Sequence, residues 1–387
     1  MKTLIINSGS SSLKFKVLSE TMETEFSGLF DKIGAAQGIY TAKKNEEKFK
    51  EEFEITNHDL AIEFLVKQMK EQEIISDINE IKAVGHRVAH GGEQFTKTTE
   101  ITLDNLIDLE AVSGLAPLHN PVSVKTIRLF LENYQGMRQF AIFDTAFHQT
   151  LPAYNYLYPL PTSYYKEDQI RKYGFHGTSH QFVSLEANKL YPEDTKVISC
   201  HIGNGASICA IKDGKSLNTS MGFTPLAGLM MGTRTGDIDP SIIPFIMEKH
   251  DMQPNDIVEL INKKSGLLGV SGLSNDLREI ESEANNGNEQ CQLAIDMYVN
   301  RIQGEISKYI TELEGLDTLI FTAGVGENSR SIRKAVLSKF AYLGLELDEQ
   351  RNLDNEIEIH SKDSKIKVLV IPTDEELMMG LEVKKNS

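Results

Sequence analysis

Two segments of the chain combine small residues, hydroxyl groups and glycine in the way that phosphate-binding turns do. The first is N-S-G-S-S-S-L-K at 7–14, which follows a short apolar run and includes Lys14. The second is H-I-G-N-G-A-S at 201–207. Backbone N–H groups and hydroxyls in such turns can hold an anion. Either segment alone also fits an ordinary hairpin, because Ser and Gly are frequent turn residues.

Two arginines lie in glycine-containing segments that suit the binding of an anion. Arg87 lies in G-H-R-V-A-H-G-G, after an apolar strand-like run, and its planar guanidinium can donate two bonds to a carboxylate or phosphate. Arg234 lies in M-G-T-R-T-G-D-I-D-P, where a loop could present it to a transferring phosphoryl group. The alternatives are a surface arginine for Arg87 and, for Arg234, an ion pair with Asp237 or Asp239.

One acid and one histidine complete the candidates in the first half of the chain. Asp144 in F-D-T-A-F-H-Q ends a short strand, where it could orient a cation, bind a metal through water or cap a turn. His176 in Y-G-F-H-G-T-S-H is flanked closely by glycines that let a ligand approach the backbone. A structural role is the alternative for each.

Two segments near the C-terminus have a strand on one side and a helix on the other. A-G-V-G-E-N-S at 323–329 resembles half of a dinucleotide fingerprint, and its backbone could pack against a base or a phosphate at a helix N-terminus. In P-T-D-E-E-L, Thr373 and Glu376 have the spacing of a capping box. That box leaves Asp374 and Glu375 available to a metal or water.

The elements that must position these residues repeat one plan. Strands are predicted at 3–7, 13–18 and 23–30, and residues 196–218 again read as strand, turn, strand, turn, strand. Apolar spacing predicts helices at 58–71 and 289–313, while 318–323 and 365–371 read as buried strands. The pattern predicts two duplicated α/β domains with mixed sheets flanked by helices, and ligands at the carboxyl ends of the strands.

Composition excludes several classes of function. The formal net charge is −16 over 387 residues, so a large nucleic-acid surface is not expected. Three widely spaced cysteines give neither a disulfide framework nor a zinc pattern. No apolar run approaches the ~18 residues of a membrane span. We therefore expect a cytoplasmic protein with small-molecule partners, without nucleic acid or membrane.

The motifs resemble, in order, those of the acetokinase family within the actin, hexokinase and sugar-kinase superfamily. The resemblance runs from residue 7 to Glu375, nearly the whole chain. The matching segments are N-S-G-S-S-S-L-K, G-H-R-V-A-H-G-G, L-A-P-L-H-N-P at 115–121, F-D-T-A-F-H, Y-G-F-H-G-T-S-H, C-H-I-G-N-G-A-S, G-T-R-T-G-D-I-D-P and G-V-G-E-N.

The resemblance implies two actin-like ATPase domains of the ribonuclease H-like type and an active site in the cleft between them. We expect an N-terminal domain at 1–147, onto which a helix at 377–387 packs back, and a nucleotide-binding domain at 148–376. The family is homodimeric. Its reaction is reversible phosphoryl transfer between ATP and acetate, with Mg²⁺, or possible Mn²⁺, giving acetyl phosphate and ADP.

The resemblance also assigns roles residue by residue. It implies Asn7 and Glu375 at the metal, and Asp144, His176, Arg234 and Arg87 in catalysis, with Arg87 also at the substrate. For ATP it implies Lys14, His201, Ile202, Gly203, Asn204, Gly205, Asp276, Leu277, Arg278, Gly324, Val325, Gly326, Glu327 and Asn328. For the acyl group it implies a pocket of Ala89, Leu118, Phe175 and Pro225.

Three points qualify these expectations. The family usually credits Asp144 with proton transfer, but acetate is already ionised, so we expect Asp144 to orient an arginine or a metal-bound water. Ala89 replaces a common valine, and the larger pocket makes propionate an alternative substrate. An actin-like ATPase without a small-molecule acceptor is the alternative from another class, although it leaves Arg87 and His176 without a partner.

Overall fold

The computed structural model describes residues 2–117 and 119–387, so Leu118 lies outside the described residues. The chain divides into two compact units. The first unit comprises residues 1–146 and 374–387, and the second comprises 147–373. The C-terminal helix thus belongs to the first unit, and the boundary falls before Asp374.

The first unit contains a mixed sheet with the strand order β5-β4-β3-β2-β1-β6-β8-β7 in its described residues. Strands β1 to β5 form antiparallel neighbours, whereas β6 and β8 run parallel to β1. The strands are β1 (Lys2–Ser8), β2 (Ser12–Leu18), β3 (Thr24–Asp31), β4 (Gly38–Lys44), β5 (Glu47–Phe53), β6 (Ile81–Val88), β7 (Thr99–Ile101) and β8 (Arg138–Phe143).

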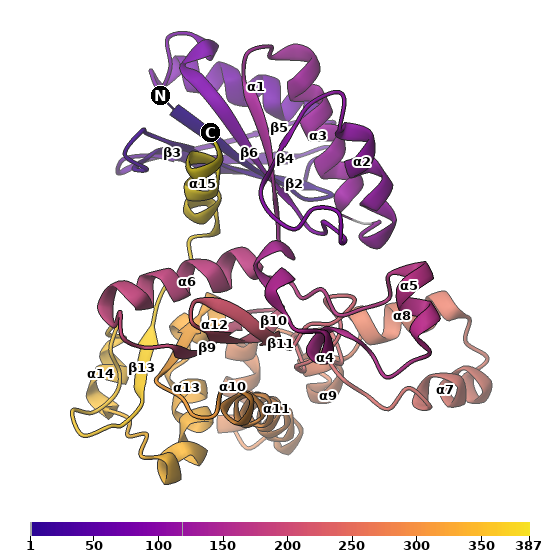
Figure 1. The fold of residues 1–387 in the computed structure, drawn as a ribbon, viewed down its shortest axis with the longest axis vertical. Helices are drawn as coiled ribbons and strands as arrows, with labels where there is room; N and C mark the ends of the chain where they lie inside the picture. Colours follow the sequence, from indigo (N-terminus) through magenta and orange to yellow (C-terminus); the bar gives the residue numbers. More distant parts are fainter. Residues whose placement is uncertain (1, 118) are drawn as a thin grey trace. The chain divides into compact units, whose positions relative to one another are not determined.

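Helices cover this sheet. Figure 1 shows the C-terminal helix α15, in yellow, beside the strands of the first unit. Its Met379 and Val383 are buried with Ile5 of β1 and Phe140 of β8 in one apolar cluster. The helices are α1 (His58–Glu71), α2 (Leu106–Ala111), α3 (Asn120–Asn133) and α15 (Glu375–Asn386), with 3-10 turns at Ile78–Glu80 and Val112–Leu115.

The second unit repeats the central strand order of the first. Its sheet has the order β11-β10-β9-β12-β13, with the first three strands antiparallel and the others parallel to β9. The corresponding five strands of the first unit are β3-β2-β1-β6-β8, so the predicted duplication is confirmed. The strands are β9 (Lys196–Ile202), β10 (Ala206–Lys212), β11 (Lys215–Thr219), β12 (Thr318–Thr322) and β13 (Lys367–Val370).

The helices of the second unit pack on this sheet or extend from it. The long helix α11 buries Tyr298, Ile302 and Ile306 in the main core of the unit. The helices are α4 (Ala153–Tyr156), α5 (Thr162–Asp168), α6 (Gly177–Leu190), α7 (Ile242–His250), α8 (Pro254–Lys263), α9 (Gly266–Ser271), α10 (Leu277–Asn285), α11 (Glu289–Leu313), α12 (Ala323–Asn328), α13 (Arg330–Leu337) and α14 (Glu349–Asp354), with 3-10 turns at Ala146–Thr150 and Ser338–Leu343.

Two local predictions are wrong. G-V-G-E-N is not a turn before a helix but lies inside α12, whose N-cap is Thr322. The N-cap of α15 is Asp374 rather than Thr373, because the Asp374 carboxylate accepts the Leu377 backbone N–H at 2.8 Å. Asp374 also forms an ion pair with Lys16 at 2.6 Å. Contrary to the expectation, Asp374 is therefore not available to a metal.

Candidate active site

In the first unit, strand register brings three predicted residues together at the carboxyl ends of parallel strands. Ile6 of β1 is paired with His86 of β6, so Asn7 and Arg87 follow side by side. Asp144 comes directly after β8, and its backbone N–H donates to the Val88 carbonyl oxygen at 3.1 Å. Ligands gather at such strand ends in α/β sheets.

The Arg87 guanidinium is held in a fixed orientation. Its Nε donates to Asp144 Oδ1 at 2.9 Å and its Nη2 donates to Asp144 Oδ2 at 2.6 Å. The third nitrogen, Nη1, donates to Asn7 Oδ1 at 3.3 Å. Asp144 is only 3% exposed, and its negative charge raises the pKa of Arg87 above the ordinary value. The structure thus places Asp144 where it can orient an arginine.

Acidic side chains at the start of α15 extend this group. Glu376 is buried and pairs through Oε1 with Lys14 Nζ at 2.6 Å. Burial raises the pKa of the Glu375 carboxyl to about 7, with Arg87 opposing the shift and Asp144 and Glu376 adding to it. The carboxylates of Asp144, Glu375 and Glu376 thus share this end of the first unit with Arg87 and Lys14.

These oxygen donors fit a magnesium ion better than a transition metal. Among the described residues, no group of three or more His, Cys, Asp and Glu side chains could hold a metal ion. Mg²⁺ usually binds one or two protein carboxylates and completes its shell with water and phosphate oxygens. The amide oxygen of Asn7 and the carboxylate of Glu375 match that pattern.

In the second unit, the turn after β9 meets two cationic or polar side chains. A Cβ placed on Gly205 would lie 3.5 Å from Arg234 Nη1 and 3.8 Å from His176 Nε2. Both side chains therefore lie close to the Gly205 backbone. The structure therefore brings Gly205, His176 and Arg234 together, as the sequence predicted from separate motifs.

Arg234 is not engaged as the alternative interpretation required. Its Nη1 donates to the Pro225 carbonyl oxygen at 3.1 Å, and no described carboxylate lies within ion-pairing distance. Asp237 instead accepts the Gly228 backbone N–H at 2.8 Å. Burial lowers the pKa of Arg234. A partly buried guanidinium without a carboxylate partner in the described chain is suited to an anionic ligand.

His176 and His201 form a stacked pair beside the same turn. Their ring centroids are 4.1 Å apart and their planes are inclined by 24°. His201 Nδ1 lies 2.7 Å from Ser179 Oγ. His176 has a φ of 56°, which is unusual for a residue with a side chain. Strain of this kind gathers at functional sites.

A pocket of about 500 Å³ lies next to the Gly203–Asn204 turn in the second unit. Its size suits a nucleoside. Predicted residues contribute from three segments, since the pocket is lined by Gly203, Asn204, Asp276, Leu277, Arg278, Gly324, Val325 and Asn328, and also by Gly232, Leu267, Asn275, Glu281 and Ser329. The last five were missed, although Asn275 directly precedes the predicted Asp276.

Arg278 and Asn275 give this pocket its polar character. The Arg278 guanidinium is fixed by Asp276, with Nε donating at 3.0 Å to Oδ1, while the side chain stays 89% exposed. Its planar face is therefore open to a stacked base. Asn275 Nδ2 donates to Asn204 Oδ1 at 3.0 Å, which connects the pocket wall to the phosphate turn.

Several predicted ATP-binding residues do not line this pocket. Ile202 is 1% exposed and belongs to the apolar core. Glu327 Oε1 accepts the Ala323 backbone N–H at 2.8 Å and the Thr373 backbone N–H at 3.1 Å, so a carboxylate occupies the N-terminus of α12. Since a carboxylate repels phosphate, this contact argues against a phosphate at the N-terminus of α12. Gly326, His201 and Gly205 also lie outside the lining.

A buried arginine that the sequence did not reveal holds α12 in place. Arg333 is 0% exposed, and its Nη1 donates to the carbonyl oxygens of Gly326 and Glu327 at 3.0 and 2.8 Å. Its remaining N–H groups donate to Asn352 and Asn355. Burial lowers the pKa of Arg333 to about 10. The last carbonyls of the pocket helix are thereby satisfied.

Of the predicted acyl-pocket residues, Phe175 is buried in the core of the second unit, and its carbonyl oxygen lies 3.0 Å from His148 Nε2. Ala89 and Pro225 are partly exposed in the first and second units respectively. Pro225 meets Arg234 directly. The placement of Leu118 lies outside the described residues.

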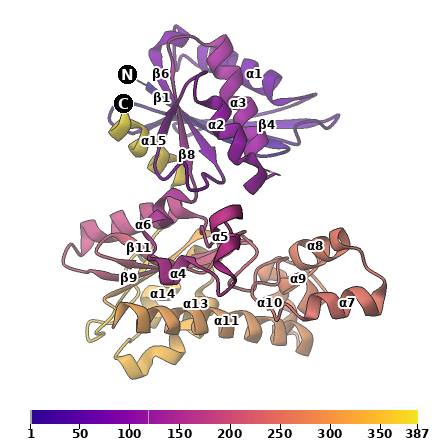
Figure 2. The same ribbon diagram turned by 45° about the vertical axis from the view of Figure 1, so that its right-hand side comes forward.

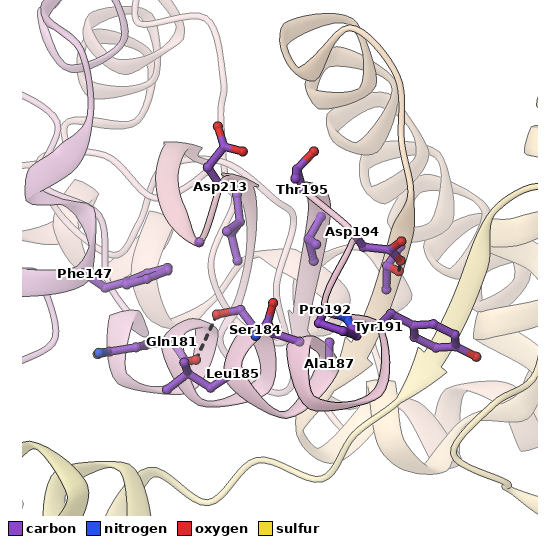
Figure 3. Close-up of a pocket in the computed structure, with 15 residues that line it drawn as sticks. Phe147, Gln181, Ser184, Leu185, Ala187, Tyr191, Pro192, Asp194, Thr195 and Asp213 are labelled. Atoms are coloured by element: carbon purple, nitrogen blue, oxygen red, sulfur yellow. Dashed lines mark hydrogen bonds between the residues drawn. The ribbon is translucent and has the colours of Figure 1, made fainter.

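A different pocket of about 430 Å³ lies along α6 (Figure 3). Its lining includes Ser184 and Leu185 of α6, Asp213 of the β10–β11 turn, and the strand starts at Val197 and Thr318. These are the strand ends opposite the glycine turn of β9. None of the predicted site residues lines it.

The fold and the two groups of side chains define an α/β protein with a pocket of nucleoside size in the second unit and an oriented arginine at the strand ends of the first. The Acetokinase family profile matches residues 2–381. A curated acetate kinase of Clostridium botulinum is 48% identical over 393 residues, covering 100% of this chain and 99% of its own length. The chain therefore belongs to the acetokinase family.

Solved structures agree with this assignment. The acetate kinase of Porphyromonas gingivalis is 42% identical, with a TM-score of 0.94 and coverage of 99% of both chains. A propionate kinase from Francisella tularensis is 41% identical, with a TM-score of 0.93 and coverage of 98% of both chains. The two similarities are nearly equal, so they do not separate acetate from propionate.

Proposed function

We propose that this chain is an acetate kinase that transfers the γ-phosphoryl group of ATP reversibly to acetate, giving acetyl phosphate and ADP. The observation that carries the proposal is the Arg87 guanidinium, held by two bonds to Asp144 and one to Asn7 at parallel strand ends. Its orientation suits a carboxylate or phosphate ligand. Full-length similarity to curated acetate kinases supports the choice of acceptor.

In the proposed reaction, cations and N–H donors stabilise the transition state, and a general base is not needed. Acetate is ionised at neutral pH, so its oxygen can attack without losing a proton. The difficulty is bringing an anion to a polyanion, and Arg87, Arg234 and His176 would stabilise the charge spread over the phosphoryl oxygens. Asp144 acts on Arg87 rather than on a substrate proton.

The metal is assigned to the first unit. We propose that Asn7 and Glu375 hold Mg²⁺, or Mn²⁺ in its place, and that the ion when bound neutralises phosphate charge. Lys14 contributes a point charge to the turn between β1 and β2, where Asn7 and Lys14 are paired in register. Burial raises the pKa of Glu375, and a bound cation would favour its ionised form.

The nucleotide is assigned to the second unit. We propose that the base and ribose occupy the pocket of Asp276, Leu277, Arg278 and the α12 segment. The triphosphate then extends along the turn from His201 to Gly205 towards Arg234. The proposed reaction thus uses residues of both units.

A second candidate substrate is propionate. Ala89 is partly exposed near Arg87 in sequence and on the same strand end, and it is smaller than valine. One methylene changes discrimination by only ~1–3 kcal/mol, so acetate and propionate would both react. The similarity to a propionate kinase supports testing both acids.

We also propose that the protein is a homodimer that pairs through α7 and α8. These helices lie together at one end of the second unit (Figure 2), and α7 contains no buried residue in the described chain. Ile242, Phe245 and Val258 are 41%, 62% and 56% exposed. The net charge of −16 argues against an anionic membrane as the partner.

No helix among residues 2–117 and 119–387 has the length and apolarity needed to span a bilayer. The expected cytoplasmic location stays a prediction. A light-scattering measurement tests the dimer, because Phe245→Glu with Val258→Glu should yield monomers. Wild-type protein that is itself monomeric at micromolar concentration would contradict the dimer proposal.

Hydroxamate trapping of the acyl phosphate tests the activity directly. With ATP, Mg²⁺ and hydroxylamine, acetate should give acetyl hydroxamate at a rate far above the rate of ATP hydrolysis alone. Propionate in a parallel assay gives the ratio of kcat/KM for the two acids. ATP hydrolysis without any acyl phosphate from either acid would favour the actin-like ATPase alternative and refute the proposal.

A further inference from the structure

At the start of α6, a single serine hydroxyl joins the partly buried imidazole of His176 to the fully buried imidazole of His180. Ser207 Oγ lies 2.9 Å from His176 Nδ1 and 2.8 Å from His180 Nε2. The other nitrogen of His180, Nδ1, lies 2.9 Å from Ser199 Oγ. His176 is the N-cap residue of α6, with a left-handed backbone, and His180 lies in the first turn of that helix, so the start of α6 brings both rings to the serines of β9 and β10.

The direction of each hydrogen bond follows from counting protons. His180 is fully buried, and burial together with His148 and His201 lowers its pKa well below the ordinary value, so the ring is neutral. A neutral imidazole has one N–H and one acceptor nitrogen. Ser199 is 0% exposed, and within the described residues its hydroxyl has His180 Nδ1 as its hydrogen-bond partner. A buried hydroxyl donates where it can.

This fixes the whole chain of donors. Ser199 donates to His180 Nδ1, so the proton of His180 is on Nε2 and is donated to Ser207. The Ser207 hydroxyl is then left to donate to His176 Nδ1. Neutral His176 therefore carries its own proton on Nε2, the nitrogen that borders Gly205.

We propose that Ser199, His180 and Ser207 are positioning residues that hold His176 as its neutral Nε2–H tautomer for phosphoryl transfer. The inference rests on the proposed function for the role of His176, but not for the tautomer itself. His176 then serves as an N–H donor to a phosphoryl oxygen rather than as a permanent cation. Arg234 supplies the positive charge at the same turn.

Protonation of His176 would disturb every hydrogen bond in the series from Ser199 to His176. An imidazolium at His176 would donate its Nδ1–H to Ser207 Oγ. The Ser207 hydroxyl would then have to donate to His180 Nε2, and the proton of His180 would have to lie on Nδ1 instead. The buried Ser199 hydroxyl then loses its acceptor. The charged and titratable groups that face these rings are His201 and Arg234 around His176, and His148 and His201 around His180. All of them disfavour an added positive charge.

Nitrogen NMR of histidine-labelled full-length enzyme tests the tautomer without any substrate. The His176 signals, identified by their loss in His176→Gln, should show the Nε2–H form unchanged from about pH 6 to about pH 8.5. Ser207→Ala should release the ring, giving mixed tautomers and an ordinary histidine titration. A wild-type His176 that is an imidazolium or an Nδ1–H form at neutral pH overturns the proposal.

Kinetics supply the second readout. Ser207→Ala should lower kcat by about 10-fold at neutral pH and leave KM for ATP and acetate within about 2-fold of the wild-type values. The pH profile of kcat should gain an inflection near the ordinary pKa of a histidine side chain. Ser199→Ala changes the end of the hydrogen-bond series that does not contact His176, so it should lower kcat in the same way but by less. It keeps the proposal testable if Ser207→Ala fails to fold.

Ser216→Ala is the matched control. It removes an equally short hydrogen bond, 2.8 Å to His148 Nδ1, from a buried serine that does not belong to the Ser199–His180–Ser207–His176 series. The control should leave the His176 signals and the pH profile unchanged. If Ser216→Ala and Ser207→Ala give the same loss and the same profile, the serines are merely structural and the proposal is refuted. Wild-type protein that forms no acyl phosphate would refute the proposed function while the tautomer result stands.

Discussion

Substituting Asp144 by asparagine distinguishes an arginine-orienting role from proton transfer. Asp144→Asn keeps one acceptor oxygen for Arg87 but loses the negative charge and one of the two bonds, at 2.9 and 2.6 Å. A hydrogen bond to a charged group contributes about 1.5–3 kcal/mol. The transition state uses the oriented guanidinium, so kcat should fall by about 10- to 150-fold. Because Arg87 is 30% exposed, water replaces part of the lost bond and the lower end is expected.

The assay is the pH profile of kcat/KM for acetate, measured by hydroxamate trapping. Asp144→Asn should lower the profile evenly, without removing any limb on which the rate depends on a base. Glu100→Gln is a matched control, because Arg138 binds Glu100 with the same distances of 2.9 and 2.6 Å on the surface. The control should keep wild-type kcat. If the pH profile of the wild type has a base-dependent limb that the profile of Asp144→Asn lacks, the orienting role is refuted and Asp144 is a general base.

Three further changes test other parts of the site. Ala89→Val should narrow the acyl pocket and raise the acetate-to-propionate ratio of kcat/KM by roughly 10-fold; an unchanged ratio would remove Ala89 from the pocket. The Mg²⁺ concentration for half-maximal rate should rise as pH falls below 7, because burial raises the pKa of Glu375 to about 7 and a protonated carboxyl cannot bind the ion. Glu375→Gln should abolish that dependence. Lys14→Ala should raise KM for ATP and lower Tm while leaving the protein folded, because Lys14 is 53% exposed but its loss leaves the buried Glu376 carboxylate without that partner; an unchanged KM for ATP would show that the turn is only a hairpin.

The sequence predicted well those features that local pattern controls. The helices at 58–71 and 289–313 have the predicted bounds, since each combines an apolar face with an asparagine N-cap. The candidate residues at strand ends were also predictable, because a charged residue after a buried run marks the end of a strand. The partner of Arg87 was not, because Asp144 is 57 positions away and pairs only through the β6–β8 register.

The two wrong predictions have different causes. Two glycines in G-V-G-E-N disfavour a helix intrinsically, yet Glu327 satisfies the first N–H groups of α12 and Arg333 its last carbonyls. The capping-box spacing of Thr373 and Glu376 is genuine, but Lys14 of a distant strand takes the Glu376 carboxylate. Lys14 is far from Glu376 along the chain, whereas Glu327 lies within α12 and Arg333 lies shortly after it, so only the capping-box prediction failed because of a distant side chain.

The duplicated strand order accommodates two different kinds of chemistry at equivalent positions. In the first unit, the turn after the first strand carries Lys14, which is already neutralised by Glu376, and the neighbouring strand ends carry a paired Arg87 and Asp144. In the second unit, the equivalent turn is Gly203–Gly205, and beside it lie His176, hydrogen-bonded to Ser207, and Arg234, which has no carboxylate partner among the described residues. The acid-rich strand ends suit a metal and the orientation of a small carboxylate. The polar but acid-poor turn suits a polyphosphate, so the difference in charge between two similar sheets supports our proposal that the metal is held in the first unit and the nucleotide in the second.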